Sequence, residues 1–205
     1  ITKIEKRENY IIRKSVNLSK QTHIIASNID YCFLFVTPSN PNTSTLFIDR
    51  VLLSTKSFGI ETIILFNKLD IYSKEDIEYV DDLFNTYTKI GYQCLKISVK
   101  KRVNIDKVEN FMNNNVSVFT GHSGVGKTSL MNILDPELNL KTSEISKQNE
   151  QGQHTTTFAE MFDLKKGAKI IDSPGIKGFG LIDIEKSEIG GFFPEIASLS
   201  SNCKF

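Results

Sequence analysis

The order of three motifs limits what this chain can fold into more than any other feature of the sequence. Asn67-Lys68-Leu69-Asp70 has the form of a guanine-reading motif, and it lies upstream of the glycine-rich segment 121–128. A third motif, Asp172-Ser173-Pro174-Gly175, follows both. All three are elements of one kind of nucleotide site, and the base reader usually follows the glycine-rich loop. The reversed order therefore predicts a nucleotide-binding domain whose chain is circularly permuted.

Short apolar runs alternate along the chain with segments of helical periodicity. Strands are predicted at 31–36, 60–66, 92–98, 116–120, 156–164 and 168–171. Helices are predicted at 46–59, 73–87, 103–114 and 127–134, the second capped by Ser73 with Asp76 three residues on. Such alternation is typical of a mostly parallel sheet with helices on both faces. The predicted fold class is α/β, a three-layer P-loop NTPase fold.

The length and the N-terminal pattern predict more than one structural unit. A chain of 205 residues accommodates one α/β core plus an appendage, but not two full domains. Residues 1–20 interleave basic and apolar side chains, as in a half-exposed strand that ends another domain. We expect the nucleotide-binding domain to span 21–182, and residues 183–205 to begin a further region.

The overall composition excludes several classes of protein. The net charge of +1 makes no global case for nucleic-acid binding, so such binding would depend on local patches. No apolar run approaches the roughly 18 residues of a membrane-spanning helix, and residues 1–6 lack the apolar core of a signal peptide. Three cysteines make a disulfide framework improbable. We expect a cytoplasmic monomer without membrane contact.

The segment 121–128 has a predicted strand before it and a helix after it, which is the setting of a phosphate-binding loop. Its glycines let successive backbone N–H groups face one anion at the helix N-terminus. Lys127 would reach the β- and γ-phosphates, and the Thr128 hydroxyl would hold Mg²⁺. The alternative is a glycine-rich turn with an incidental lysine. The predicted nucleotide-binding residues here are Gly121, His122, Ser123, Gly124, Val125, Gly126, Lys127, Thr128 and Ser129.

The motif at 67–70 distinguishes GTP and GDP from adenine nucleotides. Asp70 can accept hydrogen bonds from the N1–H and the exocyclic amine of guanine, whereas adenine offers no such donor pair. The stem of Lys68 can lie over the base, and Asn67 can brace the loop around Leu69. Ser98 ends the next predicted strand and is expected in a second base-contacting loop, where Val99-Lys100 is an uninformative continuation.

Two later segments have the positions of nucleotide-sensing switches. Asp172 can reach Mg²⁺ through water, and the Gly175 amide can meet the γ-phosphate. The segment 152–157 lies between the phosphate loop and Asp172, where the first switch belongs. One of its threonines should bind Mg²⁺, and we favour Thr156.

Ile176 stands where many GTPases place the glutamine that orients the attacking water, and an aliphatic side chain cannot do so. His154 is the titratable side chain beside the switch threonines, and it is the candidate catalytic residue that positions water or accepts its proton. The plainer alternative is a loop histidine without a role in the reaction.

The order of base reader, Ser98, phosphate loop, Gln153-His154-Thr155-Thr156-Thr157 and Asp172-Ser173-Pro174-Gly175 resembles the permuted GTPases of the RsgA/YjeQ family. The resemblance runs from about residue 23 to residue 203 and includes the segments 48–50 and 178–181. It implies a bacterial, ribosome-stimulated GTPase that acts late in assembly of the 30S subunit, with 16S rRNA as a partner. It also implies that the histidine at position 154 takes part in hydrolysis.

The resemblance further implies modules on both sides of the GTPase domain. Residues 1–20 would be the end of an oligonucleotide-binding (OB) barrel. Cys203 matches the first ligand of a C-terminal zinc module. A structural zinc site needs four ligands, and Cys203 alone cannot form one. The resemblance implies that further ligands follow it, so we expect Zn²⁺ in the intact protein. Basic residues near the N-terminus and Lys100-Lys101-Arg102 are candidates for contact with rRNA phosphates.

Three other functions remain open at the level of sequence. Ile176 is compatible with a GTP-dependent binding module that does not hydrolyse GTP. A permuted GTPase of large-subunit assembly is a second alternative, although Cys203 and the His-Thr-Thr-Thr run at 154–157 disfavour it. An ATP-dependent kinase is the third, and the base reader disfavours it.

Overall fold

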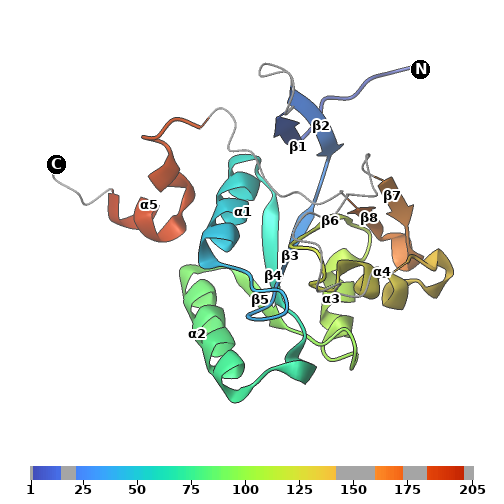
Figure 1. Ribbon diagram of the computed structural model, residues 1–205. Helices are drawn as coiled ribbons and strands as arrows, with labels where there is room; N and C mark the ends of the chain where they lie inside the picture. The colour runs from blue at the N-terminus through green and yellow to red at the C-terminus, as the bar shows by residue number, and fades with distance from the viewer. Residues whose placement is uncertain (1, 15–21, 142–159, 173–183, 201–205) are drawn as a thin grey trace.

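A computed structural model of the chain describes residues 2–14, 22–141, 160–172 and 184–200 (Figure 1). A six-stranded sheet with the order β5-β4-β3-β6-β8-β7 forms its centre. All neighbours pair in parallel except β7, which is antiparallel to β8. The strands are β3 Tyr31–Val36, β4 Glu61–Phe66, β5 Gln93–Lys96, β6 Val116–Thr120, β7 Glu160–Asp163 and β8 Lys169–Asp172.

Helices cover both faces of this sheet. The helices are α1 Thr45–Ser57, α2 Lys74–Ile90, α3 Ile105–Met112 and α4 Lys127–Leu134. Side chains alternate along β3, so that Cys32, Leu34 and Val36 join a buried cluster with α1 and α2. Phe33 and Phe35 point the other way, into a cluster with α3 and α4. The predicted three-layer α/β architecture with a mostly parallel sheet is confirmed.

Element boundaries differ from prediction where tertiary contacts intervene. The predicted helix at 103–114 begins only at Ile105, because Val103 pairs with Ser98 in an isolated antiparallel bridge and Asn104 has a left-handed φ of 57°. The strand predicted at 92–98 is shorter, at Gln93–Lys96. Residues 156–159 of the predicted strand 156–164 lie outside the described residues.

The first two strands form a separate antiparallel hairpin, β1 Tyr10–Lys14 with β2 Thr22–Ser27. The expected domain boundary after residue 20 therefore falls between two strands that pair with each other. Ile11 and Ala26 are buried in the same cluster as α1, so the hairpin packs on the core. The Asn9 side chain exchanges two hydrogen bonds with the backbone of Ile29, at 2.7 and 2.8 Å, and fixes this junction.

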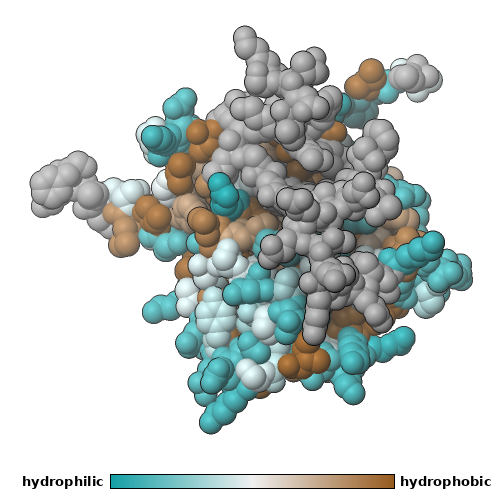
Figure 2. All heavy atoms as spheres, viewed as in Figure 1, coloured by the Kyte–Doolittle hydropathy of each residue, from teal (hydrophilic) through white to brown (hydrophobic). Residues whose placement is uncertain are grey.

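Short helical segments complete the described chain. They are the 3₁₀ turns η1 Leu69–Ile71, η2 Pro136–Leu138, η3 Lys165–Gly167 and η4 Ile189–Phe192, and the helix α5 Pro194–Ser200. The η4 turn contacts both α1 and α5, so α5 is connected to the core through η4 (Figure 1). Hydrophilic side chains gather over α2 on the face shown in Figure 2. Among the described residues, no helix has the length and apolar character needed to cross a membrane.

Candidate nucleotide-binding site

The predicted site residues that the structure describes lie at one edge of the sheet. The base-reading segment follows β4, Ser98 follows β5, the phosphate loop follows β6 and Asp172 ends β8. These strands are parallel, so their carboxyl ends meet at the same edge, which is where open α/β sheets bind ligands. Residues that lie far apart in the sequence are thus brought together.

Asn67 joins the base-reading segment to the phosphate loop. Its side-chain Nδ2 donates to the Val125 carbonyl oxygen at 2.8 Å, and its Oδ1 accepts from the Val99 N–H at 3.1 Å. Its backbone N–H donates to the Val36 carbonyl oxygen at 3.0 Å. The residue is 1% exposed, so these bonds are shielded from water. Asn67 therefore sets the relative position of three loops.

Close packing around Asn67 explains a glycine in the phosphate loop. A Cβ placed on Gly126 would lie 2.4 Å from Asn67 Nδ2, closer than any real Cβ contact. Gly126 also has a φ of +107°, which side chains rarely adopt. Position 126 therefore needs glycine both for its backbone angle and for the approach of Asn67.

Asp70 is held by the second predicted loop. The Ser98 hydroxyl donates to Asp70 Oδ1 at 2.5 Å, and Ser98 Oγ accepts from the Lys101 N–H at 3.1 Å. Leu69 contributes its backbone N–H, which donates to the Ile97 carbonyl oxygen at 3.4 Å. The carboxylate of Asp70 is thereby oriented by a residue on the neighbouring strand end.

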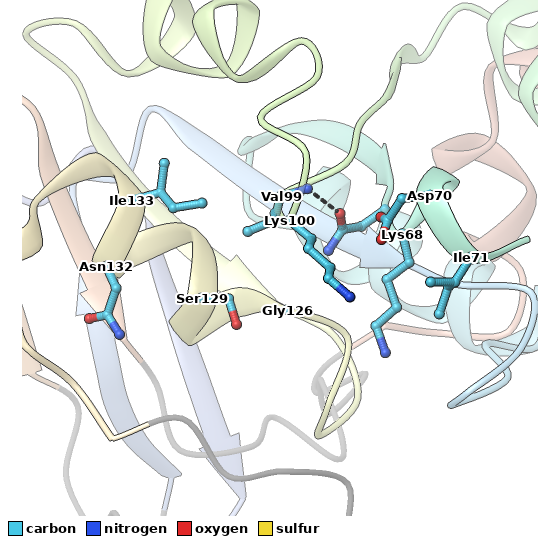
Figure 3. A pocket seen from close by; sticks show the side chains of 10 residues that line it. Lys68, Asp70, Ile71, Val99, Lys100, Gly126, Ser129, Asn132 and Ile133 are labelled. Atoms are coloured by element: carbon cyan, nitrogen blue, oxygen red, sulfur yellow. Dashed lines mark hydrogen bonds between the residues drawn. The ribbon is translucent and has the colours of Figure 1, made fainter.

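A pocket of about 500 Å³ opens between these loops and α4. Figure 3 shows Ser129, Asn132 and Ile133 of α4 on one side, Lys68, Asp70 and Ile71 on the other, and Val99 and Lys100 between them. Volumes of this size are typical of sites for nucleotide-sized ligands. The complete lining is Asn67, Lys68, Asp70, Ile71, Val99, Lys100, Gly126, Ser129, Asn132 and Ile133. Apolar walls beside one oriented carboxylate suit a planar base that carries N–H donors.

The phosphate loop leads into α4, whose N-cap is Gly126 and whose first residue is Lys127. The Lys127 ammonium donates to the carbonyl oxygens of Gly121 and His122, at 2.8 and 2.9 Å, and so lies over its own loop. Phosphate oxygens are stronger acceptors than these carbonyl groups, because the hydrogen bond then joins two charges. The loop, its lysine and the helix N-terminus together can bind an anion.

The pKa values of Lys127 and Asp172 are each shifted by burial and by the charge of the other side chain. Burial lowers the pKa of Lys127 to about 8, and the charge of Asp172 opposes that shift. Burial raises the pKa of Asp172, Lys127 opposes this, and Glu160 raises it further. The two side chains therefore act on each other within one partly buried site.

The described residues contain no group of three or more His, Cys, Asp or Glu side chains that could hold a metal ion. A Mg²⁺ ion bound through phosphates does not need such a group, because one or two protein oxygens and water complete its shell. Thr128 in the first turn of α4 and the Asp172 carboxylate, which acts on Lys127, fit that arrangement. They are the residues that would hold the ion, which would neutralise phosphate charge.

Four predicted site residues cannot be compared with the structure. His154, Thr156, Gly175 and Cys203 lie outside the described residues.

Several residues at the site were not predicted from sequence. Val99 and Lys100, considered uninformative, both line the pocket, and the Val99 N–H donates to Asn67. The Lys68 ammonium donates to the Asn40 carbonyl oxygen at 2.5 Å. Phe47 of α1 lies against the His122 ring, with centroids 4.2 Å apart and planes at 32°. No local pattern indicated these contacts, because each partner comes from a different strand–helix unit.

The fold and this site define a class: a circularly permuted P-loop nucleotide-binding domain, in which the base-reading strand precedes the phosphate-loop strand. The family model described as RsgA GTPase matches residues 4–182. The chain belongs to the RsgA GTPase family.

Relatives and solved structures agree with this assignment. Proteins named small ribosomal subunit biogenesis GTPase RsgA from Flavobacterium psychrophilum and Christiangramia forsetii are 56% and 57% identical over 205 residues. All of this chain is covered, and it spans 63% and 65% of those relatives, less than two thirds of their length.

Two crystal structures have the same fold. YjeQ from Thermotoga maritima gives a TM-score of 0.75 at 30% identity, covering 94% of this chain and 61% of that one. YloQ, described as a circularly permuted GTPase, gives 0.73 at 27% identity, covering 99% of this chain and 61% of that one.

Proposed function

We propose that this chain carries the GTP-hydrolysing part of an assembly factor for the small ribosomal subunit. One observation carries the proposal: the segment of Asp70 and the loop of Lys127, far apart in sequence, are joined at one sheet edge by the hydrogen bond from Asn67 to Val125. The names of the relatives support the ribosomal role.

The proposed roles follow the positions of the described side chains and, for Thr156 and Gly175, the sequence motifs. Asp70 accepts the guanine N–H groups, the stem of Lys68 lies over the base, and Ser98 orients Asp70. Lys127 and the loop N–H groups bind the β- and γ-phosphates. Thr128, Thr156 and Asp172 would hold Mg²⁺, and the Gly175 amide would meet the γ-phosphate.

Hydrolysis needs water placed in line with the γ-phosphate. Ile176 cannot orient that water, so we assign the task to His154, as general base or positioning group. Lys127 offsets the charge that develops on the leaving oxygens. Docking on the ribosome would complete the arrangement of the switch segments.

The partner surface and the flanking modules belong to the same proposal. The 30S subunit and its 16S rRNA are the partners, and Lys100, Lys101 and Arg102 beside the pocket are candidates for phosphate contact.

Residues 1–20 end an OB-like module, 21–182 form the GTPase domain, and 183–205 begin a zinc region in which Cys203 is one ligand. The protein acts in the cytoplasm as a monomer.

Phosphate release measured with and without 30S subunits tests this function. We expect release that 30S subunits stimulate, and a loss of about 10²-fold or more in His154→Ala, the usual size of a general-base contribution. His23→Ala, in the N-terminal hairpin, is the control and should hydrolyse GTP normally. Stimulation that survives in His154→Ala would remove the catalytic role from that residue.

A GTP-dependent binding module without hydrolysis is the second candidate, and Ile176 is the residue that favours it. It predicts tight GTP binding with no phosphate release under any condition. Co-sedimentation with 50S rather than 30S particles would instead favour a role in large-subunit assembly.

A further inference from the structure

Tyr72 lies between the base-reading segment and α2, and its side chain turns back onto the segment that precedes it. The Tyr72 hydroxyl donates to the carbonyl oxygen of Asn67. The chain reverses there because Lys68 has a left-handed φ of 72° and the Ile71 N–H donates to the Lys68 carbonyl oxygen at 3.1 Å. A closed loop from residue 67 to residue 72 results, and Asp70 lies within it.

This bond completes the hydrogen bonding of Asn67. The backbone N–H and both polar atoms of the side chain have partners in Val36, Val125 and Val99. Tyr72 supplies the donor to the remaining group, the carbonyl oxygen. Because Asn67 is 1% exposed, water has little access to replace a lost donor.

The environment of Tyr72 keeps its hydroxyl protonated. The ring is partly buried and packs against the cluster formed with α1 and α2. Burial raises the pKa of Tyr72 above its ordinary value, and the negative charges of Asp76 and Asp70 raise it further. The hydroxyl therefore remains a hydrogen-bond donor throughout the neutral pH range.

We propose that Tyr72 is a positioning residue for guanine selection, because its bond to the Asn67 carbonyl fixes the backbone turn that aims Asp70. The inference rests on the proposed function. Ser98 holds the carboxylate of Asp70 from the neighbouring strand end, at 2.5 Å. Tyr72 holds the backbone on the other side, so the direction of the carboxylate is defined by two anchors.

Affinities for GDP and IDP in Tyr72→Phe test the inference. Inosine keeps the N1–H of guanine but lacks the 2-amino group, so the dissociation constant of IDP divided by that of GDP measures the hydrogen bond from the 2-amino group to Asp70. Tyr72→Phe removes only the hydroxyl, and we expect this ratio to fall about fivefold, the effect of one hydrogen bond. Tyr79→Phe, at an exposed tyrosine of the following helix α2, is the matched control and should keep the wild-type ratio.

Thermal unfolding of the same variants separates positioning from general damage. A ratio that stays at its wild-type value in Tyr72→Phe overturns the proposal, even where both affinities or the melting temperature fall. A wild-type protein that binds GDP no better than ADP contradicts the proposed function instead.

Discussion

At the scale of single residues, Asn67 shows how a motif residue serves two loops at once. Its carboxamide donates to the phosphate loop and accepts from the loop after β5, so each end of the group has a different partner. An aspartate at this position could not donate to Val125, and an alanine could do neither. The need for both a donor and an acceptor explains why this site uses an amide.

Gly126→Ala should damage the site through this contact. The added Cβ would lie 2.4 Å from Asn67 Nδ2, so the Asn67 carboxamide or one of the two loops must move. We expect GDP affinity to fall tenfold or more, and the free energy of unfolding to fall by about 1–3 kcal/mol. Gly91→Ala is the control, because Gly91 has a similar φ of +112° but nothing within 4 Å of a Cβ. If both variants lost GDP affinity equally, the loss would come from backbone strain alone and not from the contact with Asn67.

Lys127 should make phosphate binding dependent on pH. Burial lowers its pKa to about 8, so the free protein loses this charge as the pH rises through that value. A bound phosphate favours the ammonium form, so binding above pH 8 takes up a proton and GDP affinity declines. Calorimetry in buffers of different ionisation enthalpy measures this uptake. Lys127→Arg keeps its charge, and proton uptake that persists in that variant would point to another group.

The lowered pKa of Lys127 also affects the stability of the protein without nucleotide. A lysine whose pKa is lowered by folding binds fewer protons in the folded state than in the unfolded chain. The free energy of unfolding should therefore increase as the pH rises from about 8 towards the ordinary value of 10.5.

At the scale of elements, α2 begins where side chains satisfy its first N–H groups. Ser73 Oγ accepts from the Asp76 N–H, and Asp76 Oδ2 accepts from the Ser73 N–H, both at 3.1 Å. The sequence spacing predicted this reciprocal cap. The Ser39 hydroxyl also donates to Asp76 Oδ2, at 3.2 Å, and connects the loop after β3 to the same helix end. One helix N-terminus thus links two loops near the site.

Ser73→Ala should destabilise the protein without direct damage to the pocket. We expect the free energy of unfolding to fall by about 1 kcal/mol, since a cap of the first turn is lost. Chemical denaturation measures this change. Thr86→Ala, at an exposed position inside α2, is the control and should be neutral or slightly stabilising. A Ser73→Ala protein as stable as the wild type would show that Asp76 alone caps the helix.

At the scale of the whole molecule, permutation leaves the sheet intact while changing which segments adjoin the site. The central strands β3, β4 and β6 are covered on both faces, and their carboxyl ends carry or adjoin the site loops. Loop positions depend on strand pairing rather than on chain order. A ligand that contacts several of these loops should therefore stabilise the sheet as a unit.

GDP should raise the stability of the whole domain. At one hundred times its dissociation constant, a ligand that binds only the folded state adds about 2.7 kcal/mol to the free energy of unfolding. We expect this shift with GDP in thermal or chemical denaturation. ADP at the same concentration is the control and should leave the transition almost unchanged. Equal shifts with both nucleotides would contradict base recognition by Asp70.

The sequence by itself determined the elements and the kind of site. Apolar runs such as 31–36 and 116–120 could be predicted as strands because a strand buried on both faces is a continuous apolar run in the sequence. The site could also be predicted locally, because a phosphate loop needs its strand and helix as immediate neighbours. The order of the motifs then predicted that the site is permuted.

Only the tertiary structure decided which side chains meet. The pairing of β1 with β2, the contact of Phe47 with His122 and the bond from Tyr72 to Asn67 depend on how distant or reversed segments pack. Helix α3 begins at Ile105 because a bridge between Ser98 and Val103 competes with the local helical pattern. The periodicity of apolar residues indicates whether a side chain is buried. Which side chain it contacts depends on the order of the strands and the geometry of the loops.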